Sequence, residues 1–151
     1  MEKQYHLAQL NIARMLAPID DPIMADFVAQ LDYINAVADA SPGFVWRLQT
    51  DDGNATSLRP FPDDFIIVNM SVWESIDALK AYVYNSDHLT VLRARKQWFE
   101  VPKEPMQVLW WVPADHTPDV WEAKARLEQL RRDGVSAEAF TFSKPFPPPT
   151  S

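Results

Sequence analysis

The segment from Phe65 to Trp73 constrains the fold most, because it is almost entirely apolar and yet short. It is rich in β-branched residues, which favour a strand over a helix. An apolar run of this length is typical of a strand whose two faces are both covered. We therefore expect this segment near the centre of a sheet, with side chains packed above and below it.

The rest of the chain supplies three further strands and several helices. Strands are predicted at residues 4–12, 43–50 and 106–112, and helices at 22–40, 75–84, 88–99 and 118–132. Asp21 followed by Pro22 is typical of a helix start, and Gly134 of a helix end. The order β-α-β-β-α-β predicts a ferredoxin-like α+β fold. Its four-stranded antiparallel sheet would carry helices on one face, with an extra C-terminal helix.

Length and composition indicate one domain. The chain has 151 residues, 47% of them hydrophobic, which is enough for one core. We expect a single domain over residues 1–142 and a Pro-rich tail over 143–151. No apolar segment is long enough to span a membrane, and the polar first residues do not resemble a signal peptide. The predicted location is therefore the cytoplasm.

Charge and cysteine content exclude several function classes. The net charge of −7 argues against a nucleic-acid partner and against an anionic membrane surface. The absence of cysteine excludes disulfides, thiolate metal sites and a cysteine nucleophile. The three histidines are scattered, so no metal site is predicted. Only three glycines occur, and no Gly-rich phosphate loop is among them.

The strands divide by parity into two different faces, because successive side chains of a strand point to opposite sides. One set is apolar: Ala8, Leu10, Ile12, Phe44, Trp46, Leu48, Ile66, Val68, Met70, Val72, Met106, Val108, Trp110 and Val112. The other set mixes aromatic and polar residues: Tyr5, Leu7, Gln9, Asn11, Val45, Arg47, Gln49, Phe65, Ile67, Asn69, Ser71, Trp73, Gln107, Leu109 and Trp111. Such a mixed face suits either a ligand cavity or a wet subunit interface.

A sheet with helices on one side leaves its other side uncovered. A second copy, packed sheet against sheet about a two-fold axis, is the commonest solution. We therefore predict a homodimer. Parity alone leaves open which face meets the partner and which lines a pocket.

Several motifs make the chain resemble the bacterial family called domain-of-unknown-function family 3291, from Tyr5 to about Phe142. They include Tyr5-His6-Leu7-Ala8-Gln9-Leu10-Asn11-Ile12, Ser41-Pro42-Gly43-Phe44-Val45-Trp46-Arg47-Leu48, Ser71-Val72-Trp73-Glu74-Ser75 and Leu109-Trp110-Trp111-Val112-Pro113. That family looks like a branch of the dimeric α/β-barrel superfamily. The superfamily includes antibiotic-biosynthesis-type monooxygenases and haem-degrading monooxygenases. The resemblance implies a dimeric barrel and a monooxygenase-like activity.

The residues that the haem-degrading members use can be compared with this sequence to judge whether haem is the cofactor. They use an Asn on the first strand, a Trp on the helix after the third strand and a His that ligates iron. Asn11 fits the first position, but Tyr82 stands at the second. The third falls near Leu92 or Arg93, several residues beyond His88. Two of the three positions thus depart from the pattern of the haem-degrading members. The cofactor expected from the resemblance is therefore left as either none or haem.

The candidate site residues come from the mixed face and from the helix after it. The catalytic candidates are His88 as general base or haem ligand, and Asn11 and Arg47 as partners of an oxyanion or a carboxylate. The ligand-binding candidates are Tyr82, Tyr84, Asn69, Trp73, Trp98 and Trp111. Each also has a structural explanation: His88 can simply open a helix, Arg47 can pair across a dimer, and tryptophans commonly fill cores.

Three function hypotheses follow. The first is a cofactor-independent or haem-assisted monooxygenase or isomerase of an apolar metabolite. The second is a non-catalytic binder of haem or of a metabolite. The third is a structural dimer without catalysis. The sequence leaves open the ligand, the presence of catalysis and the binding of haem.

Overall fold

The computed structural model describes residues 4–48, 65–84 and 95–149. The elements are β1 (Tyr5–Arg14), η1 (Pro22–Met24), α1 (Ala25–Asp39), β2 (Phe44–Arg47), β3 (Ile66–Trp73), α2 (Ile76–Val83), η2 (Arg95–Gln97), β4 (Gln107–Pro113) and α4 (Val120–Asp133). Most of these bounds lie within three residues of the predicted ones. The helix predicted at 88–99 lies largely outside the described residues, which include only η2 at its end.

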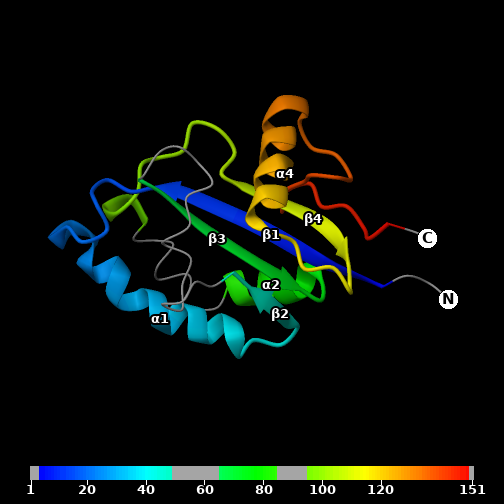
Figure 1. Ribbon diagram of the computed structural model, residues 1–151, viewed down its shortest axis with the longest axis horizontal. Coiled ribbons are helices and arrows are strands. Elements are labelled where there is room, and N and C mark those ends of the chain that lie inside the picture. Colours follow the sequence, from blue (N-terminus) through cyan, green and yellow to red (C-terminus); the bar gives the residue numbers. More distant parts are fainter. Residues whose placement is uncertain (1–3, 49–64, 85–94, 150–151) are drawn as a thin grey trace.

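The four strands form one antiparallel sheet in the order β2-β3-β1-β4. β1 and β3 are the central pair, and β2 and β4 are the edges (Figure 1). This order, with a helix between β1 and β2 and another between β3 and β4, is the ferredoxin-like topology, so the fold class predicted from the sequence is confirmed.

The helices lie on both faces of the sheet. Side chains of α1 and α2 pack with Leu7 and Trp73 on the mixed face. α4 packs on the apolar face, where it contacts β4 and β1 (Figure 1). The extra helix therefore covers part of the face opposite α1 and α2. Its four inward residues recur at helical spacing, which makes that side an apolar stripe: Val120, Ala123, Leu127 and Leu130.

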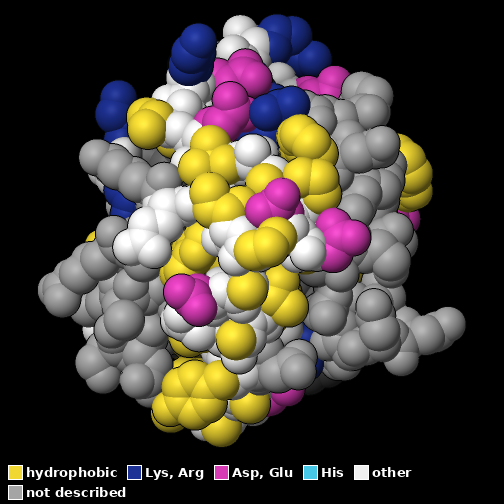
Figure 2. Space-filling view, turned by 90° about the vertical axis from the view of Figure 1, so that its left-hand side faces the viewer, with side chains coloured by type: hydrophobic (Ala, Val, Ile, Leu, Met, Phe, Trp, Pro, Cys, Tyr) yellow, Lys and Arg dark blue, Asp and Glu magenta, His cyan; other side chains and the backbone are white. Residues whose placement is uncertain are grey.

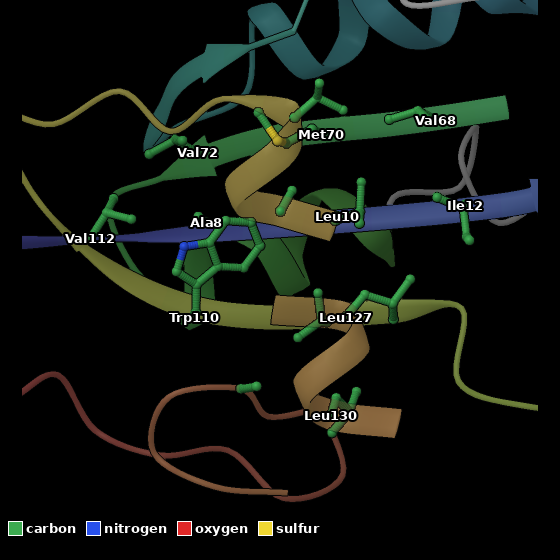
Figure 3. Close-up of a cluster of buried hydrophobic side chains, with 14 residues drawn as sticks. Ala8, Leu10, Ile12, Val68, Met70, Val72, Trp110, Val112, Leu127 and Leu130 are labelled. Atoms are coloured by element: carbon green, nitrogen blue, oxygen red, sulfur yellow. The ribbon is translucent and has the colours of Figure 1, made fainter. Parts of the chain in front are cut away.

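The main core lies between α4 and the apolar face (Figure 3). Val68, Met70 and Val72 come from β3, and Val108, Trp110 and Val112 from β4, as parity predicts. Burial at about 25 cal/mol per Å² of apolar surface makes such a cluster the principal source of stability.

Phe44 corrects the parity assignment on β2. It was expected on the apolar face with Trp46, but it lies opposite Trp73 and packs on the mixed face. The pairing of β2 with β3 is irregular between Phe44 and Trp46, as in a β-bulge. An extra residue shifts the alternation by one position, so Phe44 changes sides while Trp46 keeps its place.

The segment after α4 carries the chain around the outer edge of β4. Phe140 and Leu109 exchange two backbone hydrogen bonds, of 2.8 and 2.9 Å. Phe140 is fully buried on the mixed face, and Phe146 packs beside it. The indole Nε1 of Trp111 donates to the Phe146 carbonyl at 2.9 Å. Phe146 therefore anchors the described part of the predicted tail to the sheet, while its neighbours 143–145 and 147–149 are exposed.

No helix in the described ranges is long and apolar enough to cross a membrane.

Candidate functional site

The mixed face is organised in rows that run across β3, β1 and β4. Residues in a row are direct cross-strand partners, so their Cβ atoms lie about 4.5–5.5 Å apart. The first row is Trp73, Leu7 and Trp111; the second is Ser71, Gln9 and Leu109; the third is Asn69, Asn11 and Gln107. We call the third the carboxamide row. Beyond it come Ile67 and Ala13, so polarity is confined to the middle of the face.

Two apolar clusters flank the carboxamide row. The Trp73 cluster contains Leu7, Ala38, Trp73, Leu79, Leu109 and Phe140, with Phe44, Tyr82 and Trp111 packed against it. The Trp98 cluster contains Met15, Met24, Phe27 and Trp98, with Leu31, Phe65 and Ile67 packed against it. The row is thus a polar strip between two aromatic walls, which is the composition of a small-molecule site.

The carboxamides of this row are accessible. Asn11 and Asn69 are exposed and Gln107 is half-buried. The side chains of Asn11 and Gln107 make no hydrogen bond to the described part of the chain. A carboxamide has two donors and one acceptor group, so this row offers both kinds of partner to a ligand.

A buried hydrogen-bond network lies next to the row. Gln9 is only 4% exposed, and its Nε2 donates to Asn69 Oδ1 at 2.8 Å and to Ser71 Oγ at 2.9 Å. The indole Nε1 of Trp73 donates to the same Ser71 Oγ at 2.8 Å. The network connects the carboxamide row to the aromatic wall through fully packed side chains.

The aromatic wall is built around Trp73. Tyr82 stacks on its indole at 5.1 Å between ring centroids, and Phe44 meets it edge-on at 5.4 Å. The Tyr82 hydroxyl donates to the Ile34 carbonyl at 3.4 Å. Burial raises the pKa of Tyr82 to about 12. The positive charge of Arg47 acts to lower this pKa, and the negative charge of Asp39 acts to raise it. Tyr82 is therefore a neutral phenol at physiological pH.

Arg47 forms an ion pair within the chain. It lies opposite Ser71, and its Nε donates to Asp39 at 2.8 Å while Nη2 donates to the same carboxylate at 3.3 Å. Its side chain is 13% exposed and that of Asp39 is 47% exposed. This pair joins the end of α1 to β2 at the edge of the Trp73 cluster.

The remaining predicted residues are dispersed. Tyr84 is 64% exposed at the end of α2. Trp98 is buried in its own cluster, against Phe27 and Phe99. Trp111 shares the first row with Trp73 but is tied to Phe146. His88 lies outside the described residues. The structure therefore places Asn11, Asn69, Trp73, Trp111 and Tyr82 on the mixed face.

Two residues at this face were not singled out by the sequence analysis as part of the site. Gln9 was placed on the mixed face only, although an amide between buried neighbours needs partners. Asn35 is buried on α1 between Leu31, which packs on the Trp98 cluster, and Ala38, which belongs to the Trp73 cluster. Asn35 is a fifth carboxamide at this face, after Asn69, Asn11, Gln107 and Gln9, and it lies on the helix that packs on both clusters.

The two described histidines lie elsewhere. His6 is opposite Val112, on the α4 side of the sheet. His116 Nε2 is 2.7 Å from Glu122 Oε1, and the other oxygen of Glu122 accepts from the indole of Trp110 at 3.0 Å. This arrangement holds the start of α4 against the sheet. Among the described residues, no three His, Cys, Asp or Glu side chains gather in a way that could hold a metal.

A surface depression lies away from the carboxamide row, at the end of the molecule where β1 ends. It has a volume of about 390 Å³ and is lined by Arg14, Glu100, Val101, Pro102, Lys103, Glu104 and Met106. Figure 2 views this end, where hydrophobic side chains run down the middle with acidic ones among them. Arg14 pairs with Glu100 at 2.6 Å and Arg131 with Glu104 at 3.3 Å, so these two acidic residues of the lining are paired within the chain.

Comparison with known proteins identifies a family and a fold. The model of the family described as "Domain of unknown function (DUF3291)" matches residues 6–151. No curated protein matches the chain. Among solved structures, PA3566 from Pseudomonas aeruginosa is similar at 12% identity and a TM-score of 0.50, covering 76% of this chain and 98% of that one.

Two further solved structures are similar at slightly lower TM-scores. SnoaB, a cofactor-independent oxygenase from Streptomyces nogalater, is 20% identical at a TM-score of 0.48, covering 74% of this chain and 95% of that one. A candidate antibiotic biosynthesis monooxygenase from Nitrosomonas europaea is 14% identical at 0.49, covering 77% and 95%. At such identities the likeness concerns the fold alone.

Proposed function

We propose that this chain, which belongs to the DUF3291 family, binds a planar apolar metabolite at the carboxamide row and stabilises the enolate form of a carbonyl group in it. The observation that carries the proposal is the placement of the row. Asn69, Asn11 and Gln107 stand side by side between two aromatic clusters, and Asn11 and Asn69 are exposed. Aromatic walls with a few convergent polar groups are typical of metabolite sites.

Carboxamides suit an oxygen that becomes negative during a reaction. Their N–H groups stabilise charge that develops on a carbonyl oxygen, and surrounding apolar side chains strengthen this effect. None of the strand residues in the three rows is titratable. A ligand that is neutral when bound and anionic only in the transition state therefore fits these three rows better than a permanently charged one.

An enolate can react with dioxygen without a cofactor, because the substrate itself supplies the electrons. A ring CH₂ beside the carbonyl becomes C=O, and the second oxygen atom leaves as water. Return of the proton to a different carbon gives isomerisation instead. The proposed activity is therefore a cofactor-independent monooxygenase or isomerase, with His88 proposed as the general base.

The described residues of this face do not fit haem. The three rows contain no imidazole and no thiolate. The Tyr82 phenol donates to a backbone carbonyl, and its pKa is raised to about 12, which opposes its use as an anionic axial ligand. We therefore propose a reaction without haem, because none of these described groups suits its axial ligand.

A non-catalytic binder is the second candidate, and one observation favours it. Because the strand residues of the rows hold no titratable group, the rows can bind an oxygen without supplying a base. Binding without proton transfer is the result expected for this candidate.

Exchange of carbon-bound hydrogen tests both candidates. The probe is 2-indanone, a planar bicyclic ketone whose CH₂ hydrogens exchange with D₂O through the enolate, and proton NMR follows the loss of signal. We expect the chain to accelerate exchange, and Asn69→Ala and Asn11→Ala each to lower the acceleration about 10- to 1000-fold. Gln97→Ala, at an exposed carboxamide on η2, is the matched control and should exchange like the native chain.

The outcomes separate the hypotheses. Saturable binding of 2-indanone without faster exchange would favour the binder. Exchange that is unchanged in both Asn variants would contradict the proposed site. Oxygen consumption measured with an electrode would distinguish a monooxygenase from an isomerase.

We also propose a homodimer. α4 contacts β4 and β1, whereas Trp46, Leu48 and Ile66 at the β2–β3 side of the apolar face are only partly buried. A second copy would cover these side chains. Light scattering coupled to gel filtration is expected to give twice the mass of 17.3 kDa, and a monomer at micromolar concentration would contradict it.

A further inference from the structure

We propose that Gln9 is a positioning residue that makes Asn69 present its N–H₂ group, and not its oxygen, to the ligand. The site then selects ligands with a hydrogen-bond acceptor over ligands with a donor. The inference rests on the proposed function of the carboxamide row and adds a specificity rule to it.

The geometry begins with the two hydrogens of the Gln9 amide. Nε2 lies 2.8 Å from Asn69 Oδ1 and 2.9 Å from Ser71 Oγ, so each hydrogen has one acceptor. Because Gln9 is only 4% exposed, water does not compete effectively for these bonds. An unmade bond at a buried amide costs about 1–3 kcal/mol, which holds the amide in one orientation.

The Trp73 indole anchors the network at its other end. Nε1–H can only donate, and it lies 2.8 Å from Ser71 Oγ, so this hydroxyl oxygen accepts from Trp73. Trp73 is fully buried and is held by Tyr82 on one side and Phe44 on another. The Ser71 oxygen thus accepts from a rigid indole and from Gln9.

The orientation of Asn69 follows. Its Oδ1 accepts from Gln9, so its Nδ2 points away from Gln9, and no described residue accepts from it. Asn69 is exposed, and its neighbour in the row is Asn11. A carbonyl oxygen of a ligand satisfies this donor. A ligand that offers only N–H at the same place leaves two donors facing each other, which is expected to weaken binding about 10- to 100-fold.

Two planar bicyclic probes of similar size separate the two cases. 2-Indanone offers only an acceptor, and indole offers only a hydrogen-bond donor at its N–H. Binding is followed by NMR shifts of the side-chain amides. The native chain is expected to bind 2-indanone about 10-fold more tightly than indole.

Gln9→Glu should reverse this preference. Once ionised, a carboxyl group at position 9 can only accept, so Asn69 turns its Nδ2 toward it and presents Oδ1 to the ligand. Gln9→Met has a similar size but neither donates nor accepts a strong hydrogen bond, so it should bind the two probes about equally. A merely structural role for Gln9 would weaken both probes together.

The free protein gives a readout that requires no ligand and no variant. Both Nε2 hydrogens of Gln9 should exchange slowly with water, and both Nδ2 hydrogens of Asn69 should exchange fast. Slow exchange at Asn69 with fast exchange at Gln9 would overturn the proposed orientation, as would an unreversed preference in a folded Gln9→Glu variant. If neither probe binds the native chain while the exchange pattern holds, the proposed function fails and the orientation of Asn69 stands.

Discussion

The phenol ring of Tyr82 lies on the indole of Trp73, with ring centroids 5.1 Å apart and planes inclined by 24°. The stack joins α2 to β3, and Trp73 in turn donates to Ser71. The same contact therefore builds the helix-to-sheet packing and one wall of the candidate site. Changes at Tyr82 should separate these two contributions.

Tyr82→Phe should retain the stack, and Tyr82→Ala should lose it. Phenylalanine keeps the ring and removes the hydroxyl, whose hydrogen bond to the Ile34 carbonyl is long at 3.4 Å, so a loss below about 1 kcal/mol is expected. Alanine leaves a cavity against Trp73 and should reduce the free energy of unfolding by about 3 kcal/mol. Urea unfolding measures both; equal losses in the two variants would contradict the importance of the stack.

The Tyr82 phenol should make stability depend on pH in the alkaline range. Burial raises the pKa of Tyr82 from 10.0 to about 12, so the unfolded chain releases this proton first. Its contribution is fully present below pH 10 and is lost as pH rises from about 10 to about 12, by up to about 3 kcal/mol. Unfolding measured through this window should show a smaller loss in Tyr82→Phe, and identical pH profiles would contradict the raised pKa.

Parity correctly placed Asn11, Asn69 and Trp73 on one face. β1 and β3 pair without interruption over eight residue pairs, so the two-residue alternation holds along both strands. Phe44 was misplaced because the irregular pairing of β2 with β3 shifts the alternation, and a bulge has no clear signal in four residues.

The sequence pattern does not predict which residues far apart in the chain pack together. The apolar stripe of α4 predicted a buried helix, but not which face of the sheet it covers. Phe140 pairs with Leu109 across 31 positions, and nothing local to either residue indicates that contact. Trp98 and Tyr84 were grouped with Trp73 through an expected helix, whereas one lies in a separate cluster and the other is exposed.

Gly43→Ala should destabilise the turn before β2. Gly43 has a φ of +81°, and a Cβ there would lie 2.5 Å from the Cβ of Ala78 on α2. Backbone strain and this clash together should cost about 2–4 kcal/mol. Gly134→Ala is the matched control, because it has the same φ but no atom within 4 Å of the added Cβ, and should cost only about 1–2 kcal/mol. Equal losses of stability in the two variants would show that Ala78 does not restrict the space at Gly43.

His88→Gln should abolish the accelerated exchange of 2-indanone while leaving its binding intact. Glutamine can still form hydrogen bonds but cannot take up a proton near neutral pH. The variant therefore loses the general base and keeps the carboxamide row intact. NMR measures exchange and binding on the same sample. Undiminished exchange in this variant would remove His88 from the proposed mechanism.

The most direct test of the carboxamide row is a titration of the ¹⁵N-labelled native chain with 2-indanone, observed at the side-chain amides. The account predicts saturable shifts at Asn69, Asn11 and Gln107, and at the indole N–H of Trp73, with no change at Gln97. Shifts that instead map to the depression lined by Arg14 and Val101, with the three carboxamides unmoved, would contradict it.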